Sequence, residues 1–141
     1  MEECAMERGS SLIPCVLYRD APAAITWLCQ VFGFHEQLRV SAGNGLIEHA
    51  QLIHGSGMLM LGSLKDNDYG RQMREPKAVG GNTQSLYLVV EDTDAVYARV
   101  QQAGGEILIP IKDEEYGGRG FTCRDLEGHL WSVGSYQPWD E

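Results

Sequence analysis

The stretch that decides the fold spans residues 85–105, SLYLVVEDTDAVYARVQQAGG. Residues 85–90 are rich in Val, Leu and Tyr, which is typical of a strand. Asp92 is a favoured helix N-cap, the apolar residues that follow it recur at helical spacing, and Gly104 can end the helix. The stretch therefore predicts a strand that leads directly into a helix.

The same order occurs earlier in the chain. Residues 12–18, LIPCVLY, predict a strand, and Asp20 follows as a second N-cap. Pro22 is tolerated in the first turn of a helix, and Gly33 stands where that helix should stop. A strand-helix unit is thus present twice, which indicates an internal repeat.

Three further strands follow each predicted helix. In the first half they are expected at residues 34–41, 46–54 and 58–61, and in the second half at 106–111, 120–124 and 129–135. Glycine-containing turns separate most of them, including Asp125-Leu126-Glu127-Gly128 before the last strand. We therefore predict one α+β domain over residues 1–141, made of two tandem βαβββ units at 11–62 and 83–136 joined by a linker at 63–82. The curled mixed sheets of the two units should surround a cleft.

Composition excludes several classes of partner. The chain has 141 residues and a formal charge of -9, so it lacks the basic patch that nucleic acid binding requires. No apolar run approaches the roughly 20 residues that span a membrane. We expect neither nucleic acid nor membrane as a partner.

The cysteines and the first residues indicate a cellular compartment. Cys4, Cys15, Cys29 and Cys123 form no CxxC pair, and the last three lie in apolar stretches that suggest core positions. Residues 1–10 lack the apolar segment of a signal peptide. Unpaired thiols fit a reducing environment, so we expect a cytoplasmic protein.

Several local motifs now point to a family. Phe32-Gly33-Phe34, His49-Ala50-Gln51-Leu52, Tyr116-Gly117-Gly118-Arg119 and Asp125-Leu126-Glu127-Gly128-His129-Leu130-Trp131 occur in this order over two repeats. This arrangement resembles the vicinal oxygen chelate superfamily, which includes glyoxalase I, extradiol dioxygenases, fosfomycin resistance proteins and bleomycin resistance proteins. The resemblance covers residues 11–136 and implies the glyoxalase/bleomycin resistance fold.

The resemblance also bears on a metal site. Metal-dependent members use four ligands, usually His and Glu, and the matching positions here are Ile13, Gln51, Ser85 and Ser132. An aliphatic side chain, an amide and two hydroxyls offer none of the imidazole or carboxylate donors that a divalent metal prefers. We expect no metal, no other cofactor and no catalytic residue.

Strand alternation selects the candidate ligand-binding residues. His49, Gln51, Ser85, Tyr87 and Ser132 should share the cleft face with aliphatic side chains. Two loop residues complete the set, Tyr116 as an aromatic wall and Arg119 as a donor to an anionic or carbonyl group.

Alternatives remain for some of these residues. Arg119 can instead pair with the Asp113-Glu114-Glu115 stretch, and His49 can be a structural residue or a general base. His54 should face away from the cleft. No acidic side chain falls on the predicted cleft face, so the negative charge should not pair with a ligand inside it.

These observations favour a metal-free, bleomycin-resistance-like protein that binds a small organic ligand, with antibiotic sequestration as one use. The resemblance implies a homodimer. The alternatives are a glyoxalase-like lyase, isomerase or dioxygenase with a displaced or non-standard active site, and a protein whose packed cleft serves only interaction. The fold alone does not decide between them.

Overall fold

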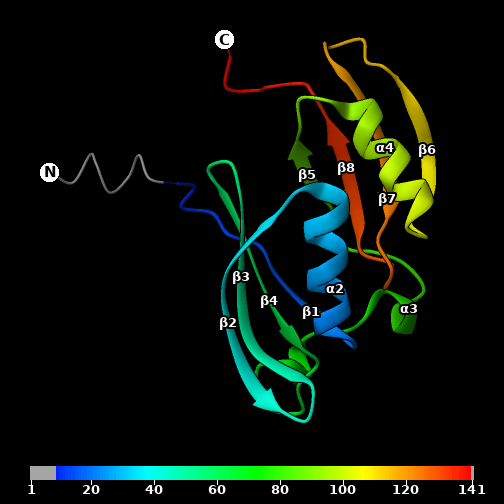
Figure 1. Cartoon of the computed structure of the whole chain (residues 1–141). Coiled ribbons are helices and arrows are strands. Elements are labelled where there is room, and N and C mark those ends of the chain that lie inside the picture. The colour runs from blue at the N-terminus through cyan, green and yellow to red at the C-terminus, as the bar shows by residue number, and fades with distance from the viewer. Residues whose placement is uncertain (1–8, 141) are drawn as a thin grey trace, which may run out of the picture. The chain divides into compact units, whose positions relative to one another are not determined.

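The computed structural model describes residues 9–140, and the chain divides into two compact units between Arg74 and Glu75 (Figure 1). Each unit contains a four-stranded mixed sheet and a helix that follows its first strand. The predicted α+β fold with tandem βαβββ units is confirmed. Among the described helices, none combines the length and the apolar character needed to cross a bilayer.

The first unit has the strand order β1-β4-β3-β2, with β1 parallel to β4 and the other neighbours antiparallel. Its elements are β1 (Cys15–Tyr18), α2 (Ala21–Trp27), a π-helical turn η1 (Leu28–Phe32), β2 (His35–Gly43), β3 (Leu46–His54), β4 (Gly57–Ser63) and the short η2 (Gly70–Gln72). β1 begins later than predicted. Pro14, which has no N–H to donate, immediately precedes it.

The second unit repeats this order as β5-β8-β7-β6, again with one parallel pair, β5 and β8. Its elements are α3 (Pro76–Val79), β5 (Leu86–Val89), α4 (Thr93–Gln102), β6 (Glu106–Asp113), β7 (Arg119–Arg124) and β8 (Leu130–Gly134). The segment 63–82, predicted as a linker, contains η2 and α3 and contributes Ser63 to β4.

The two N-caps are formed as predicted. Asp20 Oδ1 accepts a hydrogen bond from Ala23 N at 3.1 Å, and Asp92 Oδ1 accepts one from Ala95 N at 3.1 Å. Gly33 ends the first helical segment with a φ of 85°, a conformation that glycine adopts without a steric penalty. The same local chemistry therefore starts the helix in both units.

Removing either cap is expected to have a similar, moderate effect. Asp20→Ala and Asp92→Ala should each lower the free energy of unfolding by about 1 kcal/mol, because one backbone N–H at each helix start loses its acceptor. The losses should add in the double variant, since the two caps share no partner. Urea denaturation followed by circular dichroism measures this, and a loss confined to one cap would contradict the equivalence of the two units.

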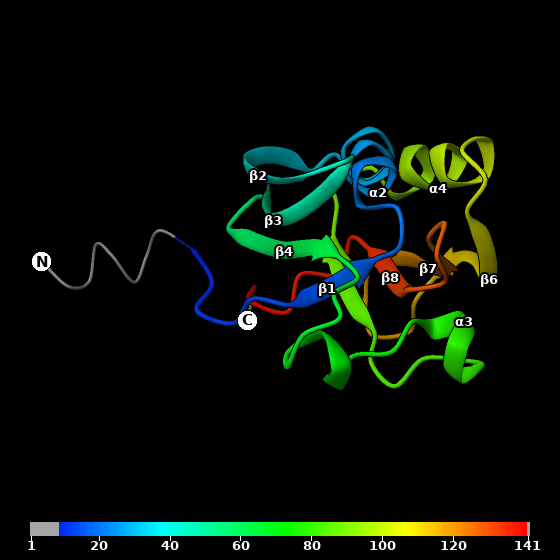
Figure 2. The ribbon, with the colours of Figure 1, turned by 90° about the horizontal axis from the view of Figure 1, so that it is seen from below.

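One face of each sheet packs against the helix of its own unit. In the second unit α4 lies along β6 and β7, as Figure 2 shows. The buried core includes alternate strand residues of both sheets, Tyr18, Ala50, Leu52, Leu88, Val90, Trp131 and Val133. In the second unit, Tyr87 on the opposite face of β5 is 44% exposed, so this face of the sheet is available for a site.

Only one of the three cysteines expected in the core is fully buried. Cys123 is inaccessible to solvent, and burial raises the pKa of its thiol to about 12, so it is an inert apolar residue. Cys29 is half-buried, and Cys15 is exposed at the first residue of β1. Cys4 lies outside the described residues.

The Asp125-Leu126-Glu127-Gly128 turn is held by its buried carboxylate. Asp125 Oδ1 accepts hydrogen bonds from the backbone N–H groups of Glu127 and His129, both at 3.0 Å. Asp125 Oδ2 accepts one from Trp131 Nε1 at 3.1 Å. The carboxylate therefore fixes the turn between β7 and β8 and joins it to the core indole.

Candidate functional site

The candidate site is a cavity of about 290 Å³ on the sheet of the second unit. It brings together the five predicted residues of that unit, Ser85, Tyr87, Tyr116, Arg119 and Ser132. The other lining residues are Glu114, Gly120, Phe121, Thr122, Val133, Gly134 and Tyr136. Strand alternation in β5 and β8 thus placed Ser85, Tyr87 and Ser132 on one surface.

Two glycines let larger groups lie close to the strands. A Cβ placed on Gly134 would come within 3.0 Å of Tyr87 Oη, and one placed on Gly120 within 3.5 Å of Glu114 Oε2. Beside them, Thr122 and Ser132 face each other across β7 and β8, with their hydroxyl oxygens 2.9 Å apart. The cavity floor is therefore glycine and hydroxyl groups.

Tyrosines form the walls. The Tyr87 hydroxyl donates a hydrogen bond to the Tyr136 carbonyl oxygen at 2.8 Å. The rings of Tyr116 and Tyr136 meet edge to face with centroids 5.0 Å apart. Burial, together with the nearby Tyr116 and Glu114, raises the pKa of Tyr87 above its usual value, so its phenol stays neutral at physiological pH. Tyr116 is 63% exposed and offers much of its ring to solvent.

The Arg119 guanidinium is already bound within the protein. Its Nε lies 3.1 Å from Asp94 Oδ2, and its Nη1 lies 3.1 Å from Asp113 Oδ1. These hydrogen bonds raise the pKa of Arg119 above its usual value. The pair with Asp113 is one of the two uses expected from the sequence, whereas Asp94, at the start of α4, is a partner that the sequence did not indicate.

The expectation that no acidic side chain reaches the site is wrong for this cavity. Glu114 lines it, with a half-buried side chain. Glu114 lies just beyond β6, where Glu114 N donates to Gly118 O at 2.9 Å and Gly117 N donates to Glu114 O at 3.1 Å. This turn places the carboxylate over Gly120, an arrangement that strand alternation cannot predict for a residue outside the strands.

In the first unit, His49 and Gln51 lie together on β3. His49 Nε2 is 2.9 Å from Gln51 Oε1, and Gln51 Nε2 donates to Gln37 Oε1 at 2.7 Å. Because the amide nitrogen of Gln51 is turned to Gln37, its oxygen accepts from His49, which assigns the proton to Nε2. The imidazole Nδ1 of a neutral His49 is then a hydrogen-bond acceptor.

A separate cavity of about 580 Å³ lies within the first unit. Ile13, Gln37, Ile53 and Met58 line it, together with residues 9–11 and the turn at 55–57. Neither His49 nor Gln51 is among its lining residues. His54 packs against the Phe34 ring with centroids 5.3 Å apart, and burial lowers the pKa of its imidazole.

The four residues that the resemblance matches to metal ligands do not fit a divalent cation. The oxygen and the nitrogen of Gln51 are bonded to His49 and Gln37, and Ser132 is paired with Thr122. Ile13 offers no donor atom, and a neutral hydroxyl such as that of Ser85 is a poor ligand. Within residues 9–140, no three His, Cys, Asp or Glu side chains are grouped to hold a metal ion.

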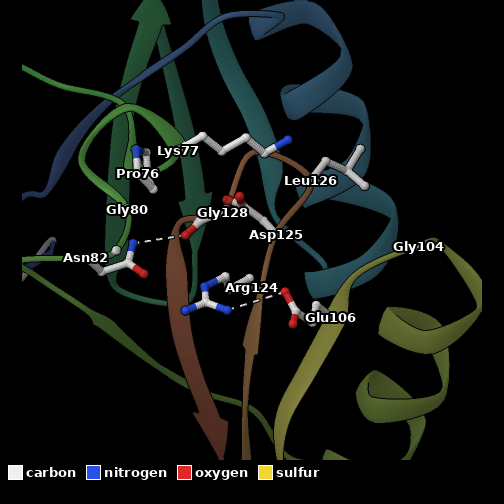
Figure 3. Close-up of a pocket in the computed structure, with 11 residues that line it drawn as sticks. Pro76, Lys77, Gly80, Asn82, Gly104, Glu106, Arg124, Asp125, Leu126 and Gly128 are labelled. Carbon is white, nitrogen blue, oxygen red and sulfur yellow. Dashed lines mark hydrogen bonds and ion pairs between the residues drawn. The ribbon is translucent and has the colours of Figure 1, made fainter.

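Figure 3 shows a further cavity of about 450 Å³ in the second unit, at the other end of the β6–β7 hairpin. Its polar groups are largely turned toward each other. Arg124 Nη1 lies 3.4 Å from Glu106 Oε1, and Asn82 Nδ2 donates to Gly128 O at 2.9 Å. This internal pairing makes it a weaker candidate than the tyrosine-lined cavity.

Sequence reasoning missed Thr122 and Glu114 as lining residues. Thr122 had a usable signal, since pairing the last two strands about the turn at 125–128 sets Thr122 opposite Ser132. No sequence signal indicated Glu114, because its position depends on how the loop with Gly117 and Gly118 folds back.

Known proteins are similar to this chain in both sequence and architecture. The sequence profile of the Glyoxalase/Bleomycin resistance protein/Dioxygenase superfamily matches residues 13–133. The uncharacterized protein Rv0887c of Mycobacterium tuberculosis (strain ATCC 25618 / H37Rv) is 30% identical over 124 residues, which cover 88% of this chain and 73% of that protein.

Solved structures have a similar architecture. TioX from Micromonospora sp. ML1 is 33% identical with a TM-score of 0.68, and the match covers 89% of this chain and 94% of TioX. The fosfomycin resistance protein FosX from Mesorhizobium loti shares the fold at 16% identity, with a TM-score of 0.61 and 92% coverage of both chains. The repeated βαβββ units, the profile match over most of the chain and the shared architecture together show that this chain belongs to the Glyoxalase/Bleomycin resistance protein/Dioxygenase superfamily.

Proposed function

We propose that the protein binds a small organic molecule in the tyrosine-lined cavity of its second unit and holds it without making or breaking a bond. The observation that carries the proposal is the lining itself. Tyr87, Tyr116 and Tyr136 line the cavity together with glycines, Thr122 and Ser132. Ring surface with a few hydroxyls is typical of a pocket that recognises a small molecule.

The same lining argues for binding over catalysis. The Thr122 and Ser132 hydroxyls bond to each other, and the Tyr87 hydroxyl bonds to a backbone carbonyl. The partners of these hydroxyls are thus another hydroxyl or a carbonyl oxygen, and neither is a base that would activate a nucleophile. The positions that hold a metal in other family members do not fit one, so the proposed binding is metal-independent.

The cavity also limits the size and shape of the ligand. Its volume of about 290 Å³ lies just below the usual range for small-molecule sites, about 300–1,000 Å³. The open face of Tyr116 suits a flat aromatic ring. We therefore propose a compact aromatic ligand. Sequestration of an antibiotic in the cytoplasm by a homodimer is the finer form of this proposal.

Replacing Tyr116 tests the proposal. Tyr116→Ala should weaken the binding of an aromatic compound, found by a thermal-shift screen, by about tenfold, because an exposed ring that stacks on the ligand is removed. Isothermal titration calorimetry measures the affinity. Tyr69→Ala is the matched control, since Tyr69 is 51% exposed and lies outside the cavity lining.

Metal independence has its own measurement. Dialysis against a chelator should leave both the melting temperature and the ligand affinity unchanged. The second measurement is elemental analysis of protein purified without chelator. A transition metal present in stoichiometric amount would contradict the proposal. Equal affinities of the wild-type protein and Tyr116→Ala would show that the ligand binds elsewhere.

A further inference from the structure

We infer that Glu114 makes this site selective for ligands that carry an organic cation, such as a protonated amine beside an aromatic ring. The inference rests on the proposed function and names the chemical class of its ligand. Its basis is the side chain that was not expected in the cavity.

The position of Glu114 is the first observation. Its side chain is half-buried on the cavity wall, and its Oε2 lies over Gly120, 3.5 Å from where a Cβ would stand. None of the ion pairs formed within the described chain, residues 9–140, involves Glu114. A carboxylate that is partly removed from water without a cationic partner is stabilised when a ligand brings one.

The charges around it favour the same conclusion. Arg119 is the one basic residue of the lining, and its guanidinium is bound to Asp94 and Asp113. The remaining lining residues carry hydroxyls, apolar groups or no side chain, and burial keeps the Tyr87 phenol neutral. Glu114 is therefore the uncompensated charge of this cavity, and it repels anionic ligands while attracting cations.

The aromatic walls complete the recognition of a cation. The ring faces of Tyr116 and its neighbours attract a positive charge through their quadrupole. An ammonium group can thus approach the Glu114 carboxylate while the ring attached to it lies against tyrosine. A neutral ligand would gain the ring contact alone.

Three naphthalene compounds of nearly the same size separate these contributions. They are 1-naphthylmethylamine, which is cationic at pH 7, 1-naphthylmethanol, which is neutral, and 1-naphthoate, which is anionic. Calorimetry at low salt should show the amine binding about tenfold more tightly than the alcohol, because it forms a charge-assisted hydrogen bond. The anionic 1-naphthoate should bind more weakly than either the amine or the alcohol.

Glu114→Gln should reduce the affinity for the amine to the level of the alcohol. The affinity for the alcohol itself should not change. Glu115→Gln is the matched control, since Glu115 is adjacent and exposed but does not line the cavity. It should leave the preference for the amine intact. Both variants keep side-chain shape, and their melting temperatures report whether the fold is preserved.

The outcomes distinguish this inference from the proposed function. If amine and alcohol bind equally and Tyr116→Ala weakens both, the site binds ligands as proposed but the role of Glu114 is overturned. The same holds if Glu114→Gln has no effect. If no compound binds, or Tyr116→Ala changes nothing, the proposed function fails and the inference fails with it.

Discussion

Asp125→Ala is expected to lower the free energy of unfolding of the second unit by about 3–5 kcal/mol. The Asp125 side chain is 6% exposed and accepts three hydrogen bonds, from the backbone N–H groups of Glu127 and His129 and from Trp131 Nε1. Leaving such donors without an acceptor costs about 1–3 kcal/mol each when they are buried. Urea denaturation followed by tryptophan fluorescence measures the loss.

Two further variants test the explanation. Asp125→Asn keeps one acceptor oxygen, but its NH2 group faces either the backbone donors or the Trp131 Nε1 donor. This variant should therefore be destabilised less than Asp125→Ala. Asp68→Ala removes a carboxylate whose side chain is fully exposed and paired with Arg71, and it should cost less than about 1 kcal/mol. A loss at Asp125 no larger than that at Asp68 would show that the turn does not depend on its carboxylate.

Gly118→Ala should destabilise the second unit by about 3 kcal/mol and abolish ligand binding. The φ of Gly118 is 74°, which costs an L-residue about 1–2 kcal/mol. A Cβ at this position would also lie 2.6 Å from Tyr136 N and 2.9 Å from Tyr136 Cα, and the clash adds to this cost because the backbone must move. Displacing Tyr136 would disturb its ring contact with Tyr116.

Gly80→Ala isolates the steric contribution. Gly80 has a φ of 76°, and a Cβ placed on it would have nothing within 4 Å. The free energy of unfolding of this variant should therefore fall only by the backbone cost of a positive φ, about 1–2 kcal/mol. Chemical denaturation gives both stabilities, and calorimetry with 1-naphthylmethylamine gives the binding. Equal losses at the two glycines, or unchanged binding by Gly118→Ala, would contradict the close packing of the loop against Tyr136.

The features that the sequence predicted correctly depend on neighbouring residues. Asp20 and Asp92 each cap a helix through an N–H three residues later, and the Asp125 turn closes on residues two to six positions away. Strand alternation likewise placed Ser85, Tyr87 and Ser132 on one surface, because the period of a strand is fixed by its backbone.

The features that could not be predicted depend on chain folding over longer distances. Arg119 bonds to Asp94, which is 25 residues away, and no local pattern indicates that pair. Cys15 lies in an apolar stretch but at an exposed position of β1. Glu114 lines the cavity because the loop with Gly117 and Gly118 folds back. Strand alternation does not describe this loop, so the sequence predicted no acidic side chain in the site.

A crystal structure of the protein with 1-naphthylmethylamine tests the central claim most directly. We predict the intact amine, without a covalent bond or a metal ion, between Tyr116 and the Thr122–Ser132 pair, with its nitrogen beside Glu114. A ligand held instead in the first-unit cavity by Gln37 and Ile53, or a metal ion bound at Gln51 or Ser132, would contradict the account.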